Sequence, residues 1–356
     1  MSRRSAPSQR PKPEDAGSGT TQAPLTWGVL GVADIAVRQV IPAMQRSPRS
    51  RIEAIASRDP ARAAAAAKSL GIPRSHGSYE ALLADPGIEA VYIPLPNHLH
   101  VPWTIRAAEA GKHVLCEKPI ACTAAEARSL LAVRDRTGVQ IGEAFMVRSH
   151  PQWLKVRELL AAGRIGELRL VLGHFSYYRR DPNDVRSRVE YGGGVLLDIG
   201  CYPVTLSRWL FGSEPVEVAA VLERDPDFKV DRLVSGLLRF PSGQACFTVA
   251  GQAAPFQRMQ LVGTRGRIEV EIPFNAPPDR RCRLLVDDGR DLVGGGVETV
   301  TVEAANQYTL QGDDFAAAVR GRGVLPVPVE DAVANLAVLD ALFRAAESGR
   351  WERSAA

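Results

Sequence analysis

The first part of the chain repeats one pattern, in which a short apolar run precedes a longer segment whose apolar residues return at helical spacing. Strands are predicted at 25–30, 51–57, 90–93, 113–116 and 139–144, and helices at 36–46, 61–70, 79–83, 103–110 and 124–136. Because strands that alternate with helices form a parallel sheet covered on both faces, this pattern predicts an α/β domain with a doubly wound, Rossmann-type sheet.

After about residue 150 the pattern changes, and strand-like segments follow one another with few helices between them. Strands are predicted at 168–178, 216–223, 235–240, 244–251, 259–263, 267–272 and 298–303, and helices at 153–162, 311–320 and 329–348. Consecutive strands favour an open, largely antiparallel sheet in a second, C-terminal α/β domain. Residues 1–24 lack periodicity and are predicted to be a disordered tail, so the domains are predicted at 25–147 and 148–350.

Composition excludes several classes of partner. The formal net charge is only +4, and residues 1–24 hold four basic and two acidic residues of that balance, so neither nucleic acid nor a membrane is an expected partner. No apolar run approaches the length of a membrane span. The five cysteines are scattered and never form a CxxC pair, which favours a reducing compartment. We therefore expect a cytoplasmic protein.

A glycine-containing turn joins the first predicted strand to the first helix. Gly28, Gly31, Ala33 and Ile35 stand where a dinucleotide fingerprint belongs, because the helix N-terminus offers free N–H groups to a pyrophosphate. Alanines replace the later glycines of the usual motif, so a tight turn in another kind of α/β protein is the alternative. If the turn is a dinucleotide fingerprint, residues 25–147 form a dinucleotide-binding domain.

The end of the second predicted strand bears on which dinucleotide binds. Ser57 and Arg58 follow this strand, and a hydroxyl beside a guanidinium suits the 2′-phosphate of NADP. Asp59 is adjacent and could instead pair with Arg58 or accept the ribose hydroxyl of NAD. Arg58 could also be a solvated loop residue. NADP is the predicted cofactor, and NAD is the alternative.

Three further segments lie where this topology places loops over a cofactor, at 92–100, 116–119 and 192–202. They include Glu-Lys-Pro at 117–119 and Gly-Gly-Gly-Val-Leu-Leu-Asp-Ile-Gly-Cys-Tyr at 192–202. With the glycine turn, these motifs resemble the glucose–fructose oxidoreductase/inositol dehydrogenase (Gfo/Idh/MocA) family. The resemblance runs from about residue 25 to 351 and is nearest to the branch with NADP-linked xylose dehydrogenases, dihydrodiol dehydrogenases and nucleotide-sugar ketoreductases.

The resemblance implies a catalytic group made of Lys118, Asp198 and Tyr202. Tyr202 would act as the general acid/base, provided that its pKa is lowered, and the Lys118 ammonium would lower it. Asp198 would contact substrate hydroxyls. Each residue also has a structural interpretation: Lys118 as a surface lysine, Asp198 as a helix cap, and Tyr202 as packing between domains.

Other residues are predicted near the cofactor or the substrate. Leu95, Asn97, His100 and Glu117 are expected at the cofactor, although Asn97 could form a turn and His100 could belong to the core. Two further candidates for the substrate cleft are Arg148 and His150. His98 and His100 lack a nearby carboxylate or cysteine to complete a closed metal site, so no metal is predicted.

These observations predict an NADP(H)-dependent oxidoreductase that transfers a hydride to or from a sugar-like alcohol, most simply an aldose 1-dehydrogenase. A nucleotide-sugar or cyclitol ketoreductase is the alternative enzyme. A dinucleotide-binding sensor without catalysis, and a lyase or glycosidase that recycles bound NAD, are alternatives of other classes. By analogy with the family, the second domain would bind substrate on one sheet face and form a homodimer or tetramer through the other.

Overall fold

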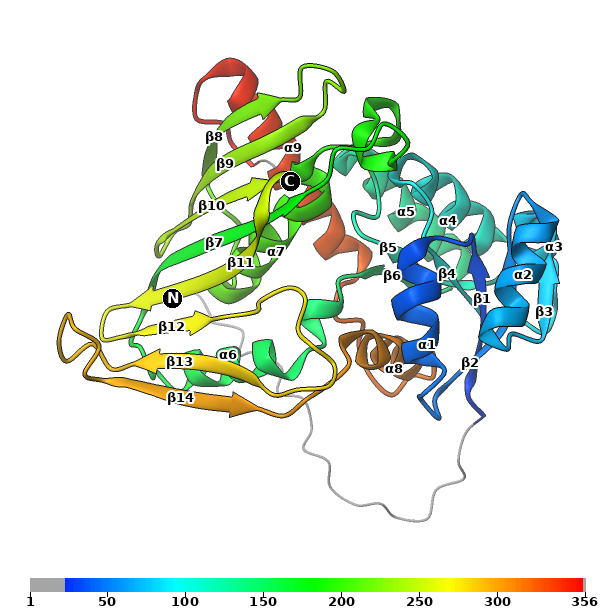
Figure 1. Ribbon diagram of the computed structural model, residues 1–356, viewed down its shortest axis with the longest axis horizontal. Helices are drawn as coiled ribbons and strands as arrows, with labels where there is room; N and C mark the ends of the chain where they lie inside the picture. The colour runs from blue at the N-terminus through cyan, green and yellow to red at the C-terminus, as the bar shows by residue number, and fades with distance from the viewer. Residues whose placement is uncertain (1–22, 355–356) are drawn as a thin grey trace, which may run out of the picture.

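The computed structural model describes residues 23–354 and contains two sheets side by side (Figure 1). The first has six parallel strands in the order β3-β2-β1-β4-β5-β6. Its strands are β1 (Leu25–Leu30), β2 (Ser50–Ala56), β3 (Arg74–His76), β4 (Ala90–Ile93), β5 (His113–Glu117) and β6 (Ile141–Ala144). The predicted Rossmann sheet is confirmed. The predicted tail lies almost wholly outside the described residues.

Helices cover both faces of this sheet. They are α1 (Ile41–Met44), α2 (Pro60–Leu70), α3 (Tyr79–Leu83), α4 (His100–Glu109) and α5 (Ala124–Thr137). At the start of α5, Thr123 accepts a hydrogen bond from the Glu126 N–H and so caps the helix. The Glu126 carboxylate accepts in turn from the Cys122 N–H. The predicted helix at 36–46 begins instead as a π-helical turn, η1 (Ala36–Val40).

The second sheet has eight strands in the order β14-β13-β12-β11-β7-β10-β9-β8. They are β7 (Leu168–Tyr178), β8 (Glu217–Arg224), β9 (Asp231–Arg239), β10 (Gln244–Ala250), β11 (Gln252–Gly263), β12 (Arg267–Val270), β13 (Cys282–Asp287) and β14 (Val297–Val302). All neighbours are antiparallel except β7 and β10. The predicted open, largely antiparallel sheet is therefore confirmed.

The sequence pattern did not predict β3 and β13, and β11 and β9 are longer than predicted. β3 is three polar residues long, and β13 has only a short apolar centre, so neither produces a clear pattern. β11 begins at Gln252 rather than at 259. Its pairing with β7 is interrupted between Gln252 and Phe256, the stretch that contains Pro255, so the sequence pattern does not indicate the first part of this strand. β9 likewise begins earlier, at Asp231.

The helices of the second half connect the two sheets. They are α6 (Pro151–Ala161), α7 (Cys201–Phe211), α8 (Gln307–Val319) and α9 (Val329–Ser348). In Figure 1, α7 and α9 lie behind the second sheet, while α8 lies below the Rossmann sheet, next to α1. α9 contacts α5 and β6 as well as β8. The predicted domain boundaries thus remain a prediction, because these last helices contact both sheets. No helix within residues 23–354 is long and apolar enough to cross a membrane.

One ion pair ties α8 to the Rossmann sheet and gives a pH-dependent prediction. Arg320 donates to both carboxylate oxygens of Glu89, which also accepts from the Thr26 N–H. Burial alone would raise the pKa of Glu89, but Arg320 and Thr26 lower it to about 2. A lowered folded-state pKa means that the stabilisation is complete above the unfolded-state pKa and is lost as the pH falls toward 2.

We therefore expect Arg320→Gln to reduce the free energy of unfolding at neutral pH by up to ~1 kcal/mol, since the pair is partly exposed. The deficit should shrink steadily below about pH 4.5. Urea unfolding at several pH values measures both effects. Arg322→Gln, at an exposed arginine two residues away, is the control and should have little effect at any pH. A deficit that does not depend on pH would contradict the role of the pair.

Candidate active site

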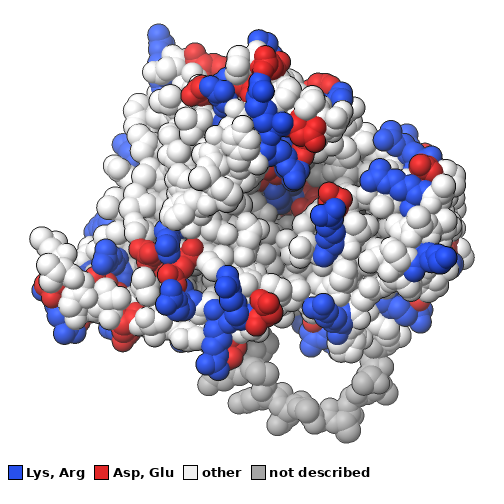
Figure 2. All heavy atoms as spheres, viewed as in Figure 1, with Lys and Arg blue, Asp and Glu red and all other residues white. Residues whose placement is uncertain are grey.

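A cavity of about 660 Å³ lies between the two sheets, where the C-terminal ends of β1, β2, β4 and β5 meet residues of the second domain. Figure 2 shows the hollow from outside, with basic and acidic side chains along its rim. Cavities of this size are typical of small-molecule and cofactor sites, and the ends of parallel strands are where Rossmann domains bind ligands. The cavity therefore brings most of the predicted site residues together.

The glycine turn forms one end of the cavity through Gly31, Ala33 and Ile35. Gly31 has φ 114°, a conformation that favours glycine, and a Cβ there would lie 3.0 Å from a Leu95 methyl group. Gly28 was also predicted at the cofactor; it does not line the cavity, and its role there remains a prediction. A Cβ at Gly28 would lie 2.5 Å from Leu82, so Gly28 serves the packing of β1 against α3.

The segment after β2 settles the role of Asp59. Its carboxylate accepts from the N–H groups of Ala61 and Arg62 and caps α2, so it is engaged away from Arg58. Ser57, Arg58 and Arg62 all line the cavity. Arg62 was not predicted; it lies in the first turn of α2 and donates to the Val32 carbonyl in the glycine turn. Among residues 23–354, no ion pair to Arg58 or Arg62 is found.

The loop after β4 contributes Leu95, Asn97 and His100, which all line the cavity. Asn97 donates its side-chain N–H to the Gly192 carbonyl and so joins the two domains. His100 is 1% exposed, and its ring nitrogens lie 2.6 Å from the Leu95 carbonyl and 2.7 Å from the Pro119 carbonyl. Both ring nitrogens thus face backbone carbonyls, and the expected place of His100 at the cofactor remains a prediction.

The end of β5 places Glu117 and Lys118 in the cavity wall. Tyr92 donates to the Glu117 carboxylate over 2.6 Å, and Lys118 is joined to Pro119 by a cis peptide bond. The Lys118 Nζ donates to the Asp198 carbonyl over 2.5 Å and lies 3.3 Å from Asp198 Oδ1. Lys118 is therefore no surface lysine but one half of an ion pair between the domains.

Asp198 is the centre of a charged network. Its Oδ2 accepts from the Tyr177 hydroxyl at 2.7 Å and from Arg186 Nε at 2.8 Å, while Oδ1 faces Lys118. Burial alone would raise the pKa of Asp198, but Arg186 and Lys118 hold it well below its ordinary value. Asp198 is thus a carboxylate that lines the cavity. The proposed contact with substrate remains a prediction.

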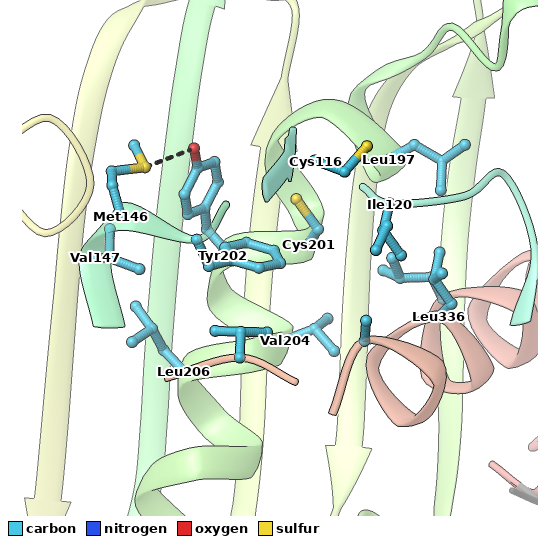
Figure 3. Packing of buried hydrophobic residues seen from close by; sticks show 14 of the residues in the cluster. Cys116, Ile120, Met146, Val147, Leu197, Cys201, Tyr202, Val204, Leu206 and Leu336 are labelled. Carbon is cyan, nitrogen blue, oxygen red and sulfur yellow. Dashed lines mark hydrogen bonds between the residues drawn. The ribbon is translucent and has the colours of Figure 1, made fainter. Parts of the chain in front are cut away.

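Tyr202 lies one turn along the same helical segment. A π-helical turn, η6 (Leu196–Gly200), leads directly into α7, so Pro203 does not break the helix. The Tyr202 hydroxyl points toward the Met146 sulfur, 3.5 Å away (Figure 3). Lys118 Nζ lies 4.9 Å from the centroid of the Tyr202 ring. Burial raises the pKa of Tyr202 well above its ordinary value, so the expectation that Lys118 lowers it is wrong. Tyr202 is a protonated phenol at neutral pH.

Two predicted substrate contacts lie elsewhere. Neither Arg148 nor His150 lines the cavity, and their contact with substrate remains a prediction. Arg148 forms an ion pair with Asp331 at 2.9 Å and stacks on Trp209. His150 is fully buried and accepts from the Gln152 N–H at the start of α6. Within the part of the chain that the structure describes, no cluster of potential metal ligands is found.

Sequence reasoning missed the residues that the end of β7 and the segment after it bring to the cavity. Tyr177, Arg179 and Arg186 line the cavity, and Tyr191 stacks on His98 of the Rossmann domain. Arg179 and Arg186 each form an ion pair with Asp184, and Arg186 also pairs with Asp198. Loop residues of this kind have no periodic pattern in the sequence. The four arginines at 179–188 are the feature of the sequence that could have indicated a binding segment.

Fold and site together define a dinucleotide-dependent oxidoreductase. Comparison with known proteins makes this more specific. Residues 25–145 match the family model for the oxidoreductase family with an NAD-binding Rossmann fold, and residues 153–269 match the GFO/IDH/MocA C-terminal domain. The chain belongs to the Gfo/Idh/MocA family of NAD(P)-dependent oxidoreductases, as its motifs predicted.

Several relatives are similar over nearly their whole length. An uncharacterized oxidoreductase of Rhizobium meliloti is 48% identical over 92% of this chain and 98% of the relative. D-xylose 1-dehydrogenase (NADP(+)) 2 of Haloferax volcanii is 39% identical over 91% and 98%, respectively. A crystal structure of a 3-ketoreductase from Actinomadura kijaniata, in complex with NADP and TDP-benzene, has a TM-score of 0.84 and 32% identity over 90% of this chain and 98% of that one.

The glycine turn generates a direct prediction. Gly31→Val would place a branched side chain at a positive φ and against Leu95, which strains the turn by roughly 1–3 kcal/mol. We expect about tenfold or greater loss of affinity for NADPH and NADH alike, measured by fluorescence titration. Gly111→Ala is the matched control, since Gly111 also has a positive φ but lies outside the cavity with open space around its Cα. Unchanged affinity in Gly31→Val would show that this turn does not hold the dinucleotide.

Proposed function

We propose that the protein is an NADP(H)-dependent oxidoreductase that transfers a hydride to or from a sugar hydroxyl carbon, as an aldose 1-dehydrogenase does. The observation that carries this proposal is the Lys118–Asp198 pair beside Tyr202, in the wall of the cavity that also contains the glycine turn. A group of ammonium, carboxylate and phenol at a dinucleotide site is suited to moving one proton at an alcohol oxygen. Similarity to a D-xylose 1-dehydrogenase supports the same activity.

NADP is the proposed cofactor because of the basic end of the cavity. Arg58 and Arg62 line it without an acidic partner among the described residues, and Ser57 lies beside them. Two guanidinium groups and a hydroxyl can bind a 2′-phosphate with charge-assisted hydrogen bonds. Asp59, which could have favoured NAD, is engaged as the cap of α2. These residues fit NADP better than NAD.

The chain's own groups have distinct roles in the proposed reaction. Bound NADP supplies the carbon that accepts or delivers the hydride. In the reductive direction Tyr202, a neutral phenol, donates a proton to the substrate oxygen, and Lys118 stabilises the charge that develops there. In the oxidative direction the Tyr202 oxygen must accept the proton of the substrate hydroxyl. Because the pKa of Tyr202 is raised, the deprotonated form becomes more abundant as the pH rises, and the rate of oxidation should increase with pH. Asp198 keeps Lys118 charged, because it raises the pKa of the ammonium although burial alone would lower it.

The charges at the substrate end favour an uncharged substrate. Arg179 is paired with Asp184, Arg186 with Asp198 and Asp184, and Lys118 with Asp198. Each of these three cations therefore has a carboxylate partner, with Asp184 and Asp198 shared between them, whereas Arg58 and Arg62 at the cofactor end have none among the described residues. A free sugar or cyclitol offers hydroxyls to such paired groups without adding charge.

A nucleotide sugar is the second candidate substrate. Arg179 and Arg186 line the cavity and could exchange their carboxylate partners for a diphosphate. The similarity to a 3-ketoreductase that binds TDP-benzene supports this alternative. A sensor without catalysis would not need Lys118, Asp198 and Tyr202 together, and recycling of a bound cofactor would show as its retention through gel filtration.

We also propose a homo-oligomer that forms through the outer face of the second sheet. This face presents exposed apolar side chains on several strands, including Val221, Leu237 and Phe256. Exposed apolar patches of this kind commonly mark interfaces between subunits.

The deciding experiment follows nicotinamide absorbance with NADP+ or NAD+ and a panel of aldoses, cyclitols and nucleotide sugars. Turnover of one aldose with NADP+ would support the proposal and name the substrate. Turnover of a nucleotide sugar alone would favour the second candidate. No turnover despite tight dinucleotide binding would favour a sensor or a recycled cofactor.

Arg58→Ala tests the choice of cofactor. We expect affinity for NADPH to fall about 10- to 100-fold, since a charge-assisted contact worth about 1.5–3 kcal/mol is lost. Affinity for NADH should be nearly unchanged, as measured by fluorescence titration with both dinucleotides. Equal loss for both would mean that Arg58 does not contact the 2′-phosphate.

Tyr202→Phe tests the proton donor. The variant keeps the ring but lacks the hydroxyl, so kcat should fall by about 100-fold or more while NADPH affinity stays near that of the unaltered protein. Steady-state kinetics and dinucleotide titration measure the two quantities. Loss of NADPH binding, or retention of most of the turnover, would contradict the assigned role.

A further inference from the structure

One peptide group behind the cavity is held by buried side chains at both its carbonyl and its N–H. It joins Pro119 to Ile120, directly after Lys118. Its carbonyl oxygen lies 2.7 Å from His100 Nδ1, and its N–H donates to Glu143 Oε1 over 2.8 Å. The two side chains come from different elements, α4 and β6, so the peptide is fixed from two sides.

Glu143 is an unusual residue for its position. It lies near the end of β6, opposite Cys116 of β5, and is 4% exposed. Within the described chain, its Oε2 has no hydrogen-bond partner, and none of its carboxylate atoms forms an ion pair. Burial raises its pKa to about 8, so the group is mainly a neutral acid at neutral pH. Burial of a carboxyl group costs free energy unless it is hydrogen-bonded, and the Ile120 N–H supplies a hydrogen bond to Glu143.

His100 completes the arrangement from the other side. Burial lowers its pKa to about 4, so the ring is neutral and donates from one nitrogen at a time. Its Nε2 faces the Leu95 carbonyl, which belongs to a loop that lines the cavity. Its Nδ1 faces the Pro119 carbonyl, which belongs to the turn after Lys118. In the Nδ1–H tautomer the ring donates to the Pro119 carbonyl, and this is the tautomer that fixes the turn.

We propose that Glu143 is a positioning residue for Lys118: it holds the Ile120 N–H, while His100 holds the carbonyl of the same peptide, and together they fix the turn from which Lys118 reaches the cavity. Glu143 does not line the cavity and touches no reacting atom, so its effect passes through the backbone. A catalytic ammonium misplaced by about 1 Å loses much of its effect. The inference rests on the proposed role of Lys118 in hydride transfer.

Two substitutions separate the hydrogen bond from the packing. Glu143→Gln keeps a carbonyl oxygen that can accept from the Ile120 N–H, and Glu143→Leu keeps similar volume but removes the acceptor. We expect the Gln variant to retain kcat within about threefold, and the Leu variant to lose about 10- to 100-fold in kcat. KM for the sugar and affinity for NADPH should change little. Asp340→Leu is the matched control, since Asp340 accepts from the Ala124 N–H beyond the turn; it should leave kcat unchanged.

Hydrogen exchange of the Ile120 amide, read by mass spectrometry, tests the contact independently of activity. The amide should be protected in the unaltered protein and in Glu143→Gln, and should exchange at least about tenfold faster in Glu143→Leu. Fast exchange in the unaltered protein would overturn the proposal even if no variant folds. Loss of protection with kcat retained would overturn it too. If no sugar is turned over by any form, the proposed function fails instead, and the exchange data still decide whether Glu143 holds the peptide.

Discussion

The ion pair between Lys118 and Asp198 joins the two halves of the molecule at the point where chemistry is proposed. Lys118 follows the last residue of β5, Asp198 lies in the π-turn before α7, and both side chains are largely buried. Removal of one partner from such a pair leaves an uncompensated charge and costs about 3–5 kcal/mol. Tyr177 of β7 and Arg186 of the following segment donate to the other oxygen of the Asp198 carboxylate, so these elements also support the pair.

The cavity divides into two electrostatic regions because of how its arginines are paired. At the glycine turn, Arg58 and Arg62 keep their charge available for a ligand, whereas Arg179 and Arg186 are balanced by carboxylates on their own segment. The proposed binding of a phosphate in one region and of a polyhydroxyl compound in the other rests on this difference in pairing among the described residues.

The sequence predicted the parts of this structure that depend on repeated patterns or on local chemistry. Strand–helix alternation gave the Rossmann sheet, and the Glu-Lys-Pro triplet led to Lys118. Tyr177 and Arg186 could not be found, because their importance arises from contacts with Asp198 across 12 and 21 residues rather than from a pattern. The pKa of Tyr202 was misjudged for a related reason: proximity to Lys118 was foreseeable, but burial among aromatic rings was not. Gly28 and His100 lie near the cofactor loops in sequence. In the structure, Gly28 packs against Leu82, and both ring nitrogens of His100 face backbone carbonyls.

The placement of α8 has a consequence for the history of the fold. Phe315 of this helix packs on Trp27 of β1, with ring centroids 5.1 Å apart, and the two belong to one buried cluster with Met44. The N-terminal sheet therefore completes its core with residues encoded almost three hundred positions later. A gene fragment that ended after β6 would expose Trp27 to water, and recombination could exchange the dinucleotide-binding half between relatives only if α8 travelled with it.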